Sequence, residues 1–194
     1  LLEESGIPAD PSRLDLSPPQ PSPTVRGVTV VHPGAASAAR RWPPERFAAV
    51  ARAECESGRD VAVSGSAAEA PLAHAVARDA GLSPKVVLAG RTDPVELAAL
   101  VGAADRVVCG DTGVAHLATA CGTPSVVLFG PTSPRDWGPP ADRPRHRALW
   151  TGRTGDPHAA EVDPGLLAIG VADVLEALSD LPGNRADERR LPAG

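Results

Sequence analysis

The stretch RVVCGDTGVAHLATACGTPSVVLFG, residues 106–130, predicts a strand, a helix and a second strand in direct succession. Its two ends, 106–109 and 125–129, are short runs of mainly β-branched and other apolar residues, whereas 113–121 between them has the length and composition of a short helix. Gly122 is suited to end that helix. Because the second strand is apolar without alternation, we expect it to lie in a parallel sheet covered on both faces.

The same alternation of strand and helix extends to both sides of this unit. Further strands are expected at 28–31, 61–63 and 86–88, with a possible short one at 148–150, and further helices at 43–57, 68–80, 92–101 and 166–178. Short strands separated by helices are typical of βαβ units. The sequence therefore predicts an α/β fold with a Rossmann-like parallel sheet and helices on both faces.

Prolines crowd the first part of the chain, at positions 8, 11, 18, 19, 21 and 23. They predict that residues 1–26 are an extended inter-domain linker with the end of a preceding N-terminal domain. Residues 27–180 are expected to form one domain, and 181–194 a flexible polar tail. Because the chain contains no Met, we expect it to be a fragment or a processed product.

Composition excludes several classes of protein. A net charge of −5 argues against nucleic acid as a partner. No apolar run approaches the ~20 residues that cross a bilayer, so no transmembrane segment is predicted. The cysteines at positions 55, 109 and 121 lack CxxC spacing, which predicts neither a disulfide framework nor a zinc site and favours a reducing cytoplasm. We expect no cofactor and, because no Asp-x-Asp motif occurs, no bound metal.

The polar residues that stand out follow the predicted strands, where parallel strands present their carboxyl ends to ligands. Thr112 is placed at the N-cap of the helix from Gly113, whose missing side chain lets an anion approach the free N–H groups. His116, in the first turn, can point back toward that anion. The alternative is that Thr112 only caps the helix and His116 only fills a polar gap.

Two further groups belong to the same predicted edge. Arg40 and Arg41, after the first strand, could clamp a diphosphate, or could be a solvated basic pair. Gly34, in the His-Pro-Gly loop between that strand and the arginines, is expected to belong to the same donor-binding group. Glu69, just beyond the second strand, could accept hydrogen bonds from ribose hydroxyls, or could be a carboxylate favoured by the start of a helix.

Six segments resemble, in order and spacing, the C-terminal domain of glycosyltransferase family 9, the ADP-heptose:lipopolysaccharide heptosyltransferases. They are HPGA (32–35), RRWP (40–43), LAGRT (88–92), ELAAL (96–100), DTGVAH (111–116) and LFGPT (128–132). The resemblance runs from Val28 to Pro140 and, more weakly, to Leu178. It implies the C-terminal half of a GT-B enzyme that transfers a heptose-like sugar, with inversion and without a metal, from an ADP-linked donor to a glycan or lipid-glycan acceptor.

The resemblance also implies roles for individual residues. Thr112 and Gly113 would contact the diphosphate, and His116 the phosphate region. Asp111 would contact the donor sugar. Arg40, where the family commonly has Lys, would stabilise the leaving phosphate, and Arg40 and Asp111 would be the catalytic residues in this chain. Glu69 lies near the family's ribose-binding Glu.

The family's general base belongs to the N-terminal domain, which also holds the acceptor. We therefore expect this chain alone to transfer little sugar, while the full enzyme could associate peripherally with a membrane. Besides Arg40, two features depart from the family: Ala36 replaces a common Ser, and 155–158 replace a Cys-rich segment. The alternatives are a UDP-sugar transferase or epimerase of the GT-B class, or a non-catalytic module that binds a nucleotide-sugar. A classical NAD-binding domain is disfavoured, because no G-x-G-x-x-G follows the first strand.

Overall fold

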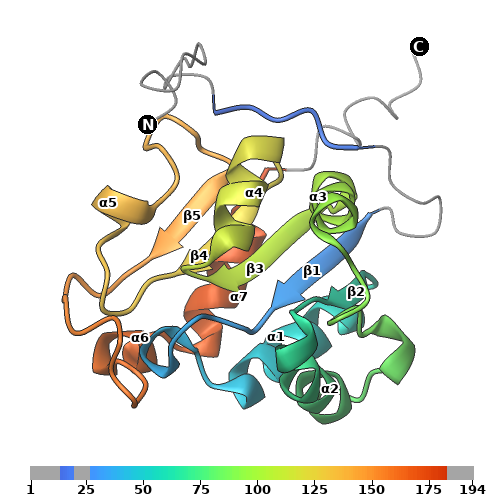
Figure 1. Ribbon diagram of the computed structural model, residues 1–194, viewed down its shortest axis with the longest axis horizontal. Helices are drawn as coiled ribbons and strands as arrows, with labels where there is room; N and C mark the ends of the chain where they lie inside the picture. Colours follow the sequence, from blue (N-terminus) through green and yellow to red (C-terminus); the bar gives the residue numbers. More distant parts are fainter. Residues whose placement is uncertain (1–13, 20–26, 183–194) are drawn as a thin grey trace.

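The computed structural model describes residues 14–19 and 27–182, which form a five-stranded parallel sheet between layers of helices (Figure 1). The strands are β1 (Val28–His32), β2 (Asp60–Val63), β3 (Arg106–Gly110), β4 (Ser125–Leu128) and β5 (His146–Leu149). Their order is β2-β1-β3-β4-β5, and every neighbouring pair is parallel. The short strand expected at 148–150 corresponds to β5, which begins two residues earlier, at His146.

Helices cover both faces of this sheet, as predicted. They are α1 (Pro44–Glu56), α2 (Ala70–Asp79), α3 (Pro94–Ala103), α4 (Gly113–Cys121), α5 (Pro134–Trp137), α6 (Pro164–Ala168) and α7 (Val171–Ser179), with 3₁₀ turns η1 (Ala38–Arg40), η2 (Ala67–Glu69) and η3 (Pro84–Val86). In Figure 1, α3 and α4 lie in front of the sheet, whereas α1 and α7 lie behind it.

The core follows from the two-residue period of the strands. In β3, Val107 and Cys109 face the α3 and α4 side, while Val108 between them packs on the α1 and α7 side. Val30 and Val31 of β1 divide in the same way. Because both faces of the central strands are buried, these strands read as continuous apolar runs.

The strand order places a topological switch point between β1 and β3. From β1 the chain moves outward to β2, then returns across to β3 on the other side of β1. At such a point the loops leaving two adjacent strands turn to opposite faces of the sheet, and a crevice opens between them. The carboxyl ends here are His32 of β1 and Gly110 of β3.

The strand predicted at 86–88 was wrong as a full strand. Val86 ends η3, and only Val87 forms a bridge, which pairs it in parallel with Val63 at the end of β2. Pro84 opens the 3₁₀ turn before it, and Gly90 turns the chain away after it with a φ of +71°. Turns this close on both sides leave room for one paired residue at the sheet edge.

The closing helix predicted at 166–178 was also wrong as a single element, because it is divided into α6 and α7. Ile169 is extended at the break, and its carbonyl accepts hydrogen bonds from Trp42 Nε1 at 2.9 Å and Arg46 Nη1 at 2.7 Å. The Gly170 N–H donates to Asp173 Oδ2 at 2.7 Å, which starts α7 anew. Trp42, only 1% exposed, anchors its loop on the domain.

The predicted linker and tail lie mostly outside the described residues. Residues 14–19 contain neither helix nor strand. The backbone N–H of Leu16 donates to the Ala120 carbonyl at 2.8 Å, and Asp15 pairs with Arg143 at 2.9 Å. At the other end, Leu181 is buried against the core. No helix within the described ranges is long and apolar enough to span a membrane.

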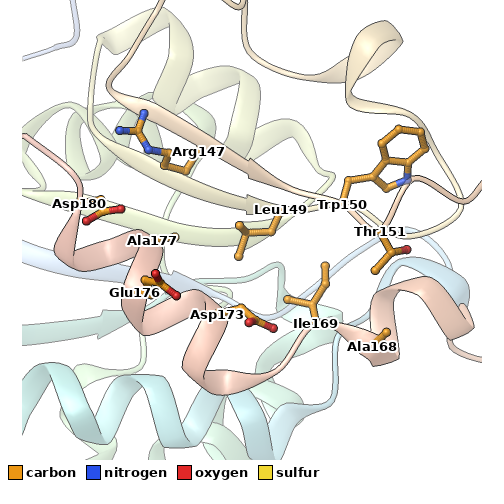
Figure 2. Close-up of a pocket in the computed structure, with 10 residues that line it drawn as sticks. All are labelled: Arg147, Leu149, Trp150, Thr151, Ala168, Ile169, Asp173, Glu176, Ala177 and Asp180. Atoms are coloured by element: carbon orange, nitrogen blue, oxygen red, sulfur yellow. The ribbon is translucent and has the colours of Figure 1, made fainter.

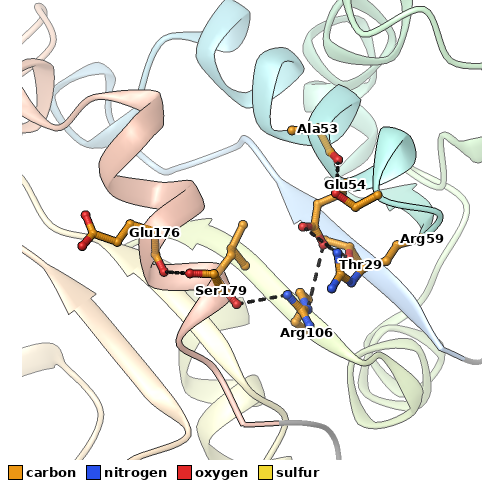
Figure 3. Close-up of polar contacts among 9 residues, drawn as sticks. Thr29, Ala53, Glu54, Arg59, Arg106, Glu176 and Ser179 are labelled. Atoms are coloured by element: carbon orange, nitrogen blue, oxygen red, sulfur yellow. Dashed lines mark hydrogen bonds and ion pairs between the residues drawn. The ribbon is translucent and has the colours of Figure 1, made fainter.

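A buried polar cluster ties α1 to the amino ends of β1 and β3 (Figure 3). Glu54, 4% exposed, accepts a hydrogen bond from Thr29 Oγ1 at 2.6 Å. Its carboxylate also lies 3.5 Å from Arg59 Nη1 and 3.9 Å from Arg106 Nε. Arg106 Nη1 donates to the Leu178 carbonyl at 3.1 Å, so the cluster reaches the end of α7. It occupies the edge of the sheet opposite the carboxyl ends.

His146 makes a pH-dependent contribution to stability. Its Nδ1 lies 2.8 Å from Ser125 Oγ, and burial, with Arg143 and Arg145, lowers the pKa of His146 to about 4 from the ordinary 6.5. The unfolded chain therefore binds this proton more readily, and stability should fall as the pH drops from about 6.5 toward about 4.

We expect His146→Asn, which can still pair with Ser125, to flatten this part of the stability profile. Urea unfolding of both proteins between about pH 7 and about pH 4 measures the difference between their free energies of unfolding. The contributions of groups that titrate in both proteins cancel in this difference. Parallel profiles for the two proteins would contradict the assignment.

Candidate functional site

A pocket of about 290 Å³ opens at the carboxyl ends of β1 and β3, at the switch point. Its lining residues are His32, Ala35, Ala36, Arg40, Glu69, Asp111, Thr112, Gly113, His116 and Trp137. These residues lie at or beyond the carboxyl ends of four of the strands. Of the residues predicted to carry function, all but Gly34 and Arg41 line this pocket.

Asp111 lies at the centre of the polar contacts. It follows β3 directly and is only 5% exposed. Its Oδ2 accepts a hydrogen bond from Thr132 Oγ1 at 2.7 Å and lies 3.5 Å from Arg40 Nη1. Thr132 belongs to the loop after β4, so the contact joins the loops of two neighbouring strands. A buried carboxylate needs such partners.

Arg40 is held at the pocket from two directions. Besides its ion pair with Asp111, its Nε donates to Ser37 Oγ at 3.4 Å. The Ser37 hydroxyl in turn donates to the Pro157 carbonyl. The guanidinium is therefore oriented before any ligand arrives, and its side chain keeps 22% of its surface exposed.

The start of α4 forms a second electropositive wall. Gly113, its first residue, is exposed, and nothing lies within 4 Å of the point where a Cβ would stand. The first N–H groups of a helix have no partner within it and carry a partial positive charge. The exposed His116 follows one turn later at the same pocket. This end of α4 is open to an anion.

Thr112 occupies the N-cap position, as predicted, but its hydroxyl does not cap the helix. The backbone there is extended, and Thr112 Oγ1 is buried without a hydrogen-bond partner of normal geometry in the described chain. Its nearby polar neighbour is the Cys109 thiol, a weak partner. Burial, then Asp111, raise the pKa of that thiol to about 12, against the smaller lowering effect of the Thr112 contact. A ligand oxygen in the pocket could satisfy the hydroxyl.

Glu69 presents a fixed carboxylate at the β2 side of the pocket. Its Oε2 accepts hydrogen bonds from the Ser66 N–H and hydroxyl, both at 2.8 Å. Burial alone would raise the pKa of Glu69, but the Ser66 hydrogen bonds, with His32 and Arg41, lower it below the ordinary value. Glu69 therefore stays ionised. Its carboxylate caps the start of η2 and also lines the pocket.

Gly34 leaves the space that this carboxylate fills. A Cβ built on Gly34 would stand 2.1 Å from Glu69 Oε1, well inside contact distance. The sequence predicted that Gly34 contacts the ligand, whereas the structure places it behind Glu69 and outside the residues that line the pocket. Its position is explained by packing against Glu69.

We expect Gly34→Ala to displace the Glu69 side chain and to cost about 1–3 kcal/mol of stability, as overpacking does. The double variant Gly34→Ala, Glu69→Ala removes the obstructing carboxylate and should recover most of that loss. Thermal unfolding of the three variants and the parent measures this cycle. Additive losses in the double variant would show that Glu69 is not what Gly34 accommodates.

Arg41 was predicted to bind the diphosphate, but the structure places it outside the pocket. It is exposed, and its Nε donates to the Ala35 carbonyl at 2.9 Å. Arg40 is the last residue of η1, whereas Arg41 follows that turn with an extended backbone. Arg41 acts at a distance, through its charge on Glu69.

His32 and Trp137 also line the pocket, although neither had a specific predicted role. His32 ends β1, and its Nδ1 lies 3.0 Å from Ser64 Oγ. Burial lowers the pKa of His32, although Glu69 works against this, so the ring is neutral near pH 7. A polar residue at the carboxyl end of a parallel strand was the signal that could have identified it. Trp137 gave no such signal, because it lies in α5.

A larger cavity, of about 390 Å³, lies elsewhere, between β5 and α7 (Figure 2). Asp173 and Glu176 of α7, with Asp180 just after the helix, line one side of it, and Arg147 of β5 lies on the other. This excess of carboxylates disfavours a diphosphate. Within 14–19 and 27–182, no group of three or more His, Cys, Asp or Glu residues could hold a metal ion.

Comparison with known proteins connects this chain with one family. The family model of glycosyltransferase family 9 (heptosyltransferase) matches residues 9–161. Lipopolysaccharide heptosyltransferase 2 of Escherichia coli K12 is 33% identical over 152 residues, which are 74% of this chain and 43% of that protein. Lipooligosaccharide heptosyltransferase 2 of Haemophilus influenzae is 34% identical over 108 residues, 54% of this chain and 31% of that one.

The fold agrees with these matches. The structure of E. coli ADP-heptose LPS heptosyltransferase II superposes with a TM-score of 0.67 at 27% identity, covering 80% of this chain and 46% of that one. The predicted α/β fold of a GT-B heptosyltransferase is thereby confirmed. The chain spans less than half the length of these relatives. Since the family model covers most of its 194 residues, the chain belongs to glycosyltransferase family 9.

Proposed function

We propose that the pocket between β1 and β3 binds the nucleotide-sugar donor of a heptosyltransferase, and that the donor is ADP-linked. The observation that carries this proposal is the convergence of the Arg40 and Asp111 pair with the open start of α4 on one pocket at the switch point. The named activities of the relatives agree with it, since these are lipopolysaccharide and lipooligosaccharide heptosyltransferases.

The parts of the donor follow the order of the loops along the sheet. Glu69, on the β2 side, would accept hydrogen bonds from the ribose hydroxyls. Arg40 and the N–H groups at Gly113 would hold the diphosphate, with Thr112 Oγ1 and His116 beside it. Asp111 would face the sugar. A neutral His32 adds no charge to the nucleoside end.

Arg40 supplies most of the stabilisation of the leaving group. When the bond between the sugar and the diphosphate breaks, negative charge accumulates on the bridging phosphate oxygen. A unit charge ~4 Å away is worth about 4 kcal/mol at an effective dielectric of ~20, whereas a helix start adds ~0.3–2 kcal/mol. Because Asp111 and Ser37 already orient Arg40, little reorganisation opposes the reaction.

The acceptor, a glycan or lipid-glycan, would attack the sugar from the face opposite the diphosphate, which inverts the configuration at that carbon. A general base must take the proton from the acceptor hydroxyl. We propose that this base belongs to an N-terminal domain of the full enzyme, so that this chain alone binds the donor but transfers little sugar.

Calorimetry on the whole chain tests the donor site with ADP, ADP-heptose, UDP and UDP-glucose as ligands. We expect ADP and ADP-heptose to bind, UDP and UDP-glucose to bind more weakly, and excess EDTA to leave ADP affinity unchanged. Tighter binding of UDP would favour a UDP-sugar enzyme instead. Absence of binding by every nucleotide would contradict the donor site itself.

A further inference from the structure

Trp137 is exposed at the mouth of the pocket. It is 57% exposed, whereas Trp42 is 1% exposed and donates its indole N–H to Ile169. The N–H of Trp150 likewise donates, to the Gly130 and Arg153 carbonyls. Within the described residues the Trp137 indole makes no hydrogen bond. An indole gains much from burial, so one left open at a pocket is suited to cover a ligand.

The backbone holds this indole in place. Pro134 begins α5, Ser133 Oγ accepts from the Arg135 N–H at 3.2 Å, and the Gly138 N–H donates to the Pro134 carbonyl at 2.8 Å. A Cβ on Gly138 would stand 2.3 Å from the Pro134 carbonyl oxygen, so only glycine allows this tight exit. Trp137 is presented on a closed turn.

The same turn is connected to Asp111. Thr132, just before α5, donates its hydroxyl to Asp111 Oδ2 at 2.7 Å. Both Asp111 and Trp137 line the pocket, one with a carboxylate and the other with an apolar ring. A carboxylate beside an aromatic face suits a sugar, because hydroxyls bond to the first while the C–H groups of the ring pack on the second.

The order of the loops separates Trp137 from the nucleoside end. Glu69 follows β2 at one side of the pocket, whereas Trp137 follows β4, on the far side of β1 and β3. If Glu69 holds the ribose and the start of α4 holds the diphosphate, the extended donor places its sugar toward β4.

We propose that Trp137 is the stacking platform for the donor's sugar ring, so that it discriminates the sugar conjugate from the bare nucleotide. This inference rests on the proposed donor site. Its indole covers the apolar face of the sugar, while Asp111 accepts from the hydroxyls. ADP, which carries no sugar, ends before this platform.

The test measures ADP and ADP-heptose affinities of the whole chain by calorimetry, for the parent, Trp137→Ala and Trp137→Phe. We expect Trp137→Ala to weaken ADP-heptose binding about tenfold, which is ~1.4 kcal/mol, and to leave ADP binding within about twofold. Trp137→Phe, which keeps an aromatic face, should retain most of the affinity. Val95→Ala, at an exposed apolar residue outside the pocket, is the matched control and should change neither ligand.

Each other outcome overturns the proposal in a recognisable way. Equal losses for ADP and ADP-heptose in Trp137→Ala would place the indole on the nucleotide. Unchanged binding of both ligands would show that the indole contacts neither. If the parent chain binds no ADP, the donor site has failed and the platform fails with it. Because Trp137 is exposed, circular dichroism should show that its variants fold normally.

Discussion

Arg40→Ala is expected to weaken ADP binding by about 10- to 100-fold, the ~1.5–3 kcal/mol that a hydrogen bond to a charged group contributes. In the full enzyme the same variant should lower turnover at least as much, because the charge on the diphosphate is greatest as the leaving group departs. The variant also leaves the buried Asp111 with Thr132 as its remaining partner, so a modest loss of stability should accompany it.

Arg41→Ala is the matched control for this experiment. It removes the same charge one residue further along, from a side chain outside the pocket, and should lower ADP affinity far less. Arg40→Lys should recover part of the affinity, since it keeps the charge without the guanidinium geometry. Equal losses of ADP affinity in Arg40→Ala and Arg41→Ala would mean that long-range electrostatic attraction, and no specific contact, binds the nucleotide.

Glu54→Ala is expected to cost about 3–5 kcal/mol of stability, because it removes the buried carboxylate that faces the largely buried Arg106. The Arg106 side chain, 13% exposed, would lose the charge of Glu54, and Thr29 would lose its hydrogen-bond acceptor. For a chain of this size the loss corresponds to a fall in Tm of about 10 °C. Calorimetric or circular-dichroism melting measures it.

Two variants bracket that result. Glu56→Ala removes an exposed carboxylate from the same helix and should leave the Tm within about 1–2 °C. Glu54→Gln keeps an acceptor for Thr29 but no charge, and should fall between the two. If Glu54→Ala leaves the Tm unchanged, water enters the cluster in this variant and solvates the arginines. ADP affinity of the folded fraction should stay normal, since the cluster lies at the opposite edge of the sheet.

The position of the site could be predicted because it depends on local patterns. Short apolar strands separated by helices specify a parallel sheet, and a parallel sheet gathers the residues after each strand at one edge. Arg40, Glu69, Asp111, Thr112, Gly113 and His116 were found in this way, and the pocket brings them together. What they bind remains a proposal.

Details that depend on distant partners could not be predicted. Helical spacing continues through Ile169, yet its carbonyl is taken by Trp42 and Arg46 from α1 and the loop before it, which breaks the helix. Nothing near Gly34 in the sequence indicates that Glu69 fills the space beside it. Arg41 looks identical to Arg40 in the sequence, and only the turn of η1 separates their directions.

The sequence by itself determined the α/β class, the helices on both faces and the edge at which the candidate site residues gather, because these follow from periodicity and chain direction. The tertiary structure decided which of those residues share the pocket, that the Thr112 hydroxyl is left without a good partner, and that Trp137 faces the opening. Such choices depend on packing between elements far apart in the chain, and no local pattern encodes the distance between two loops.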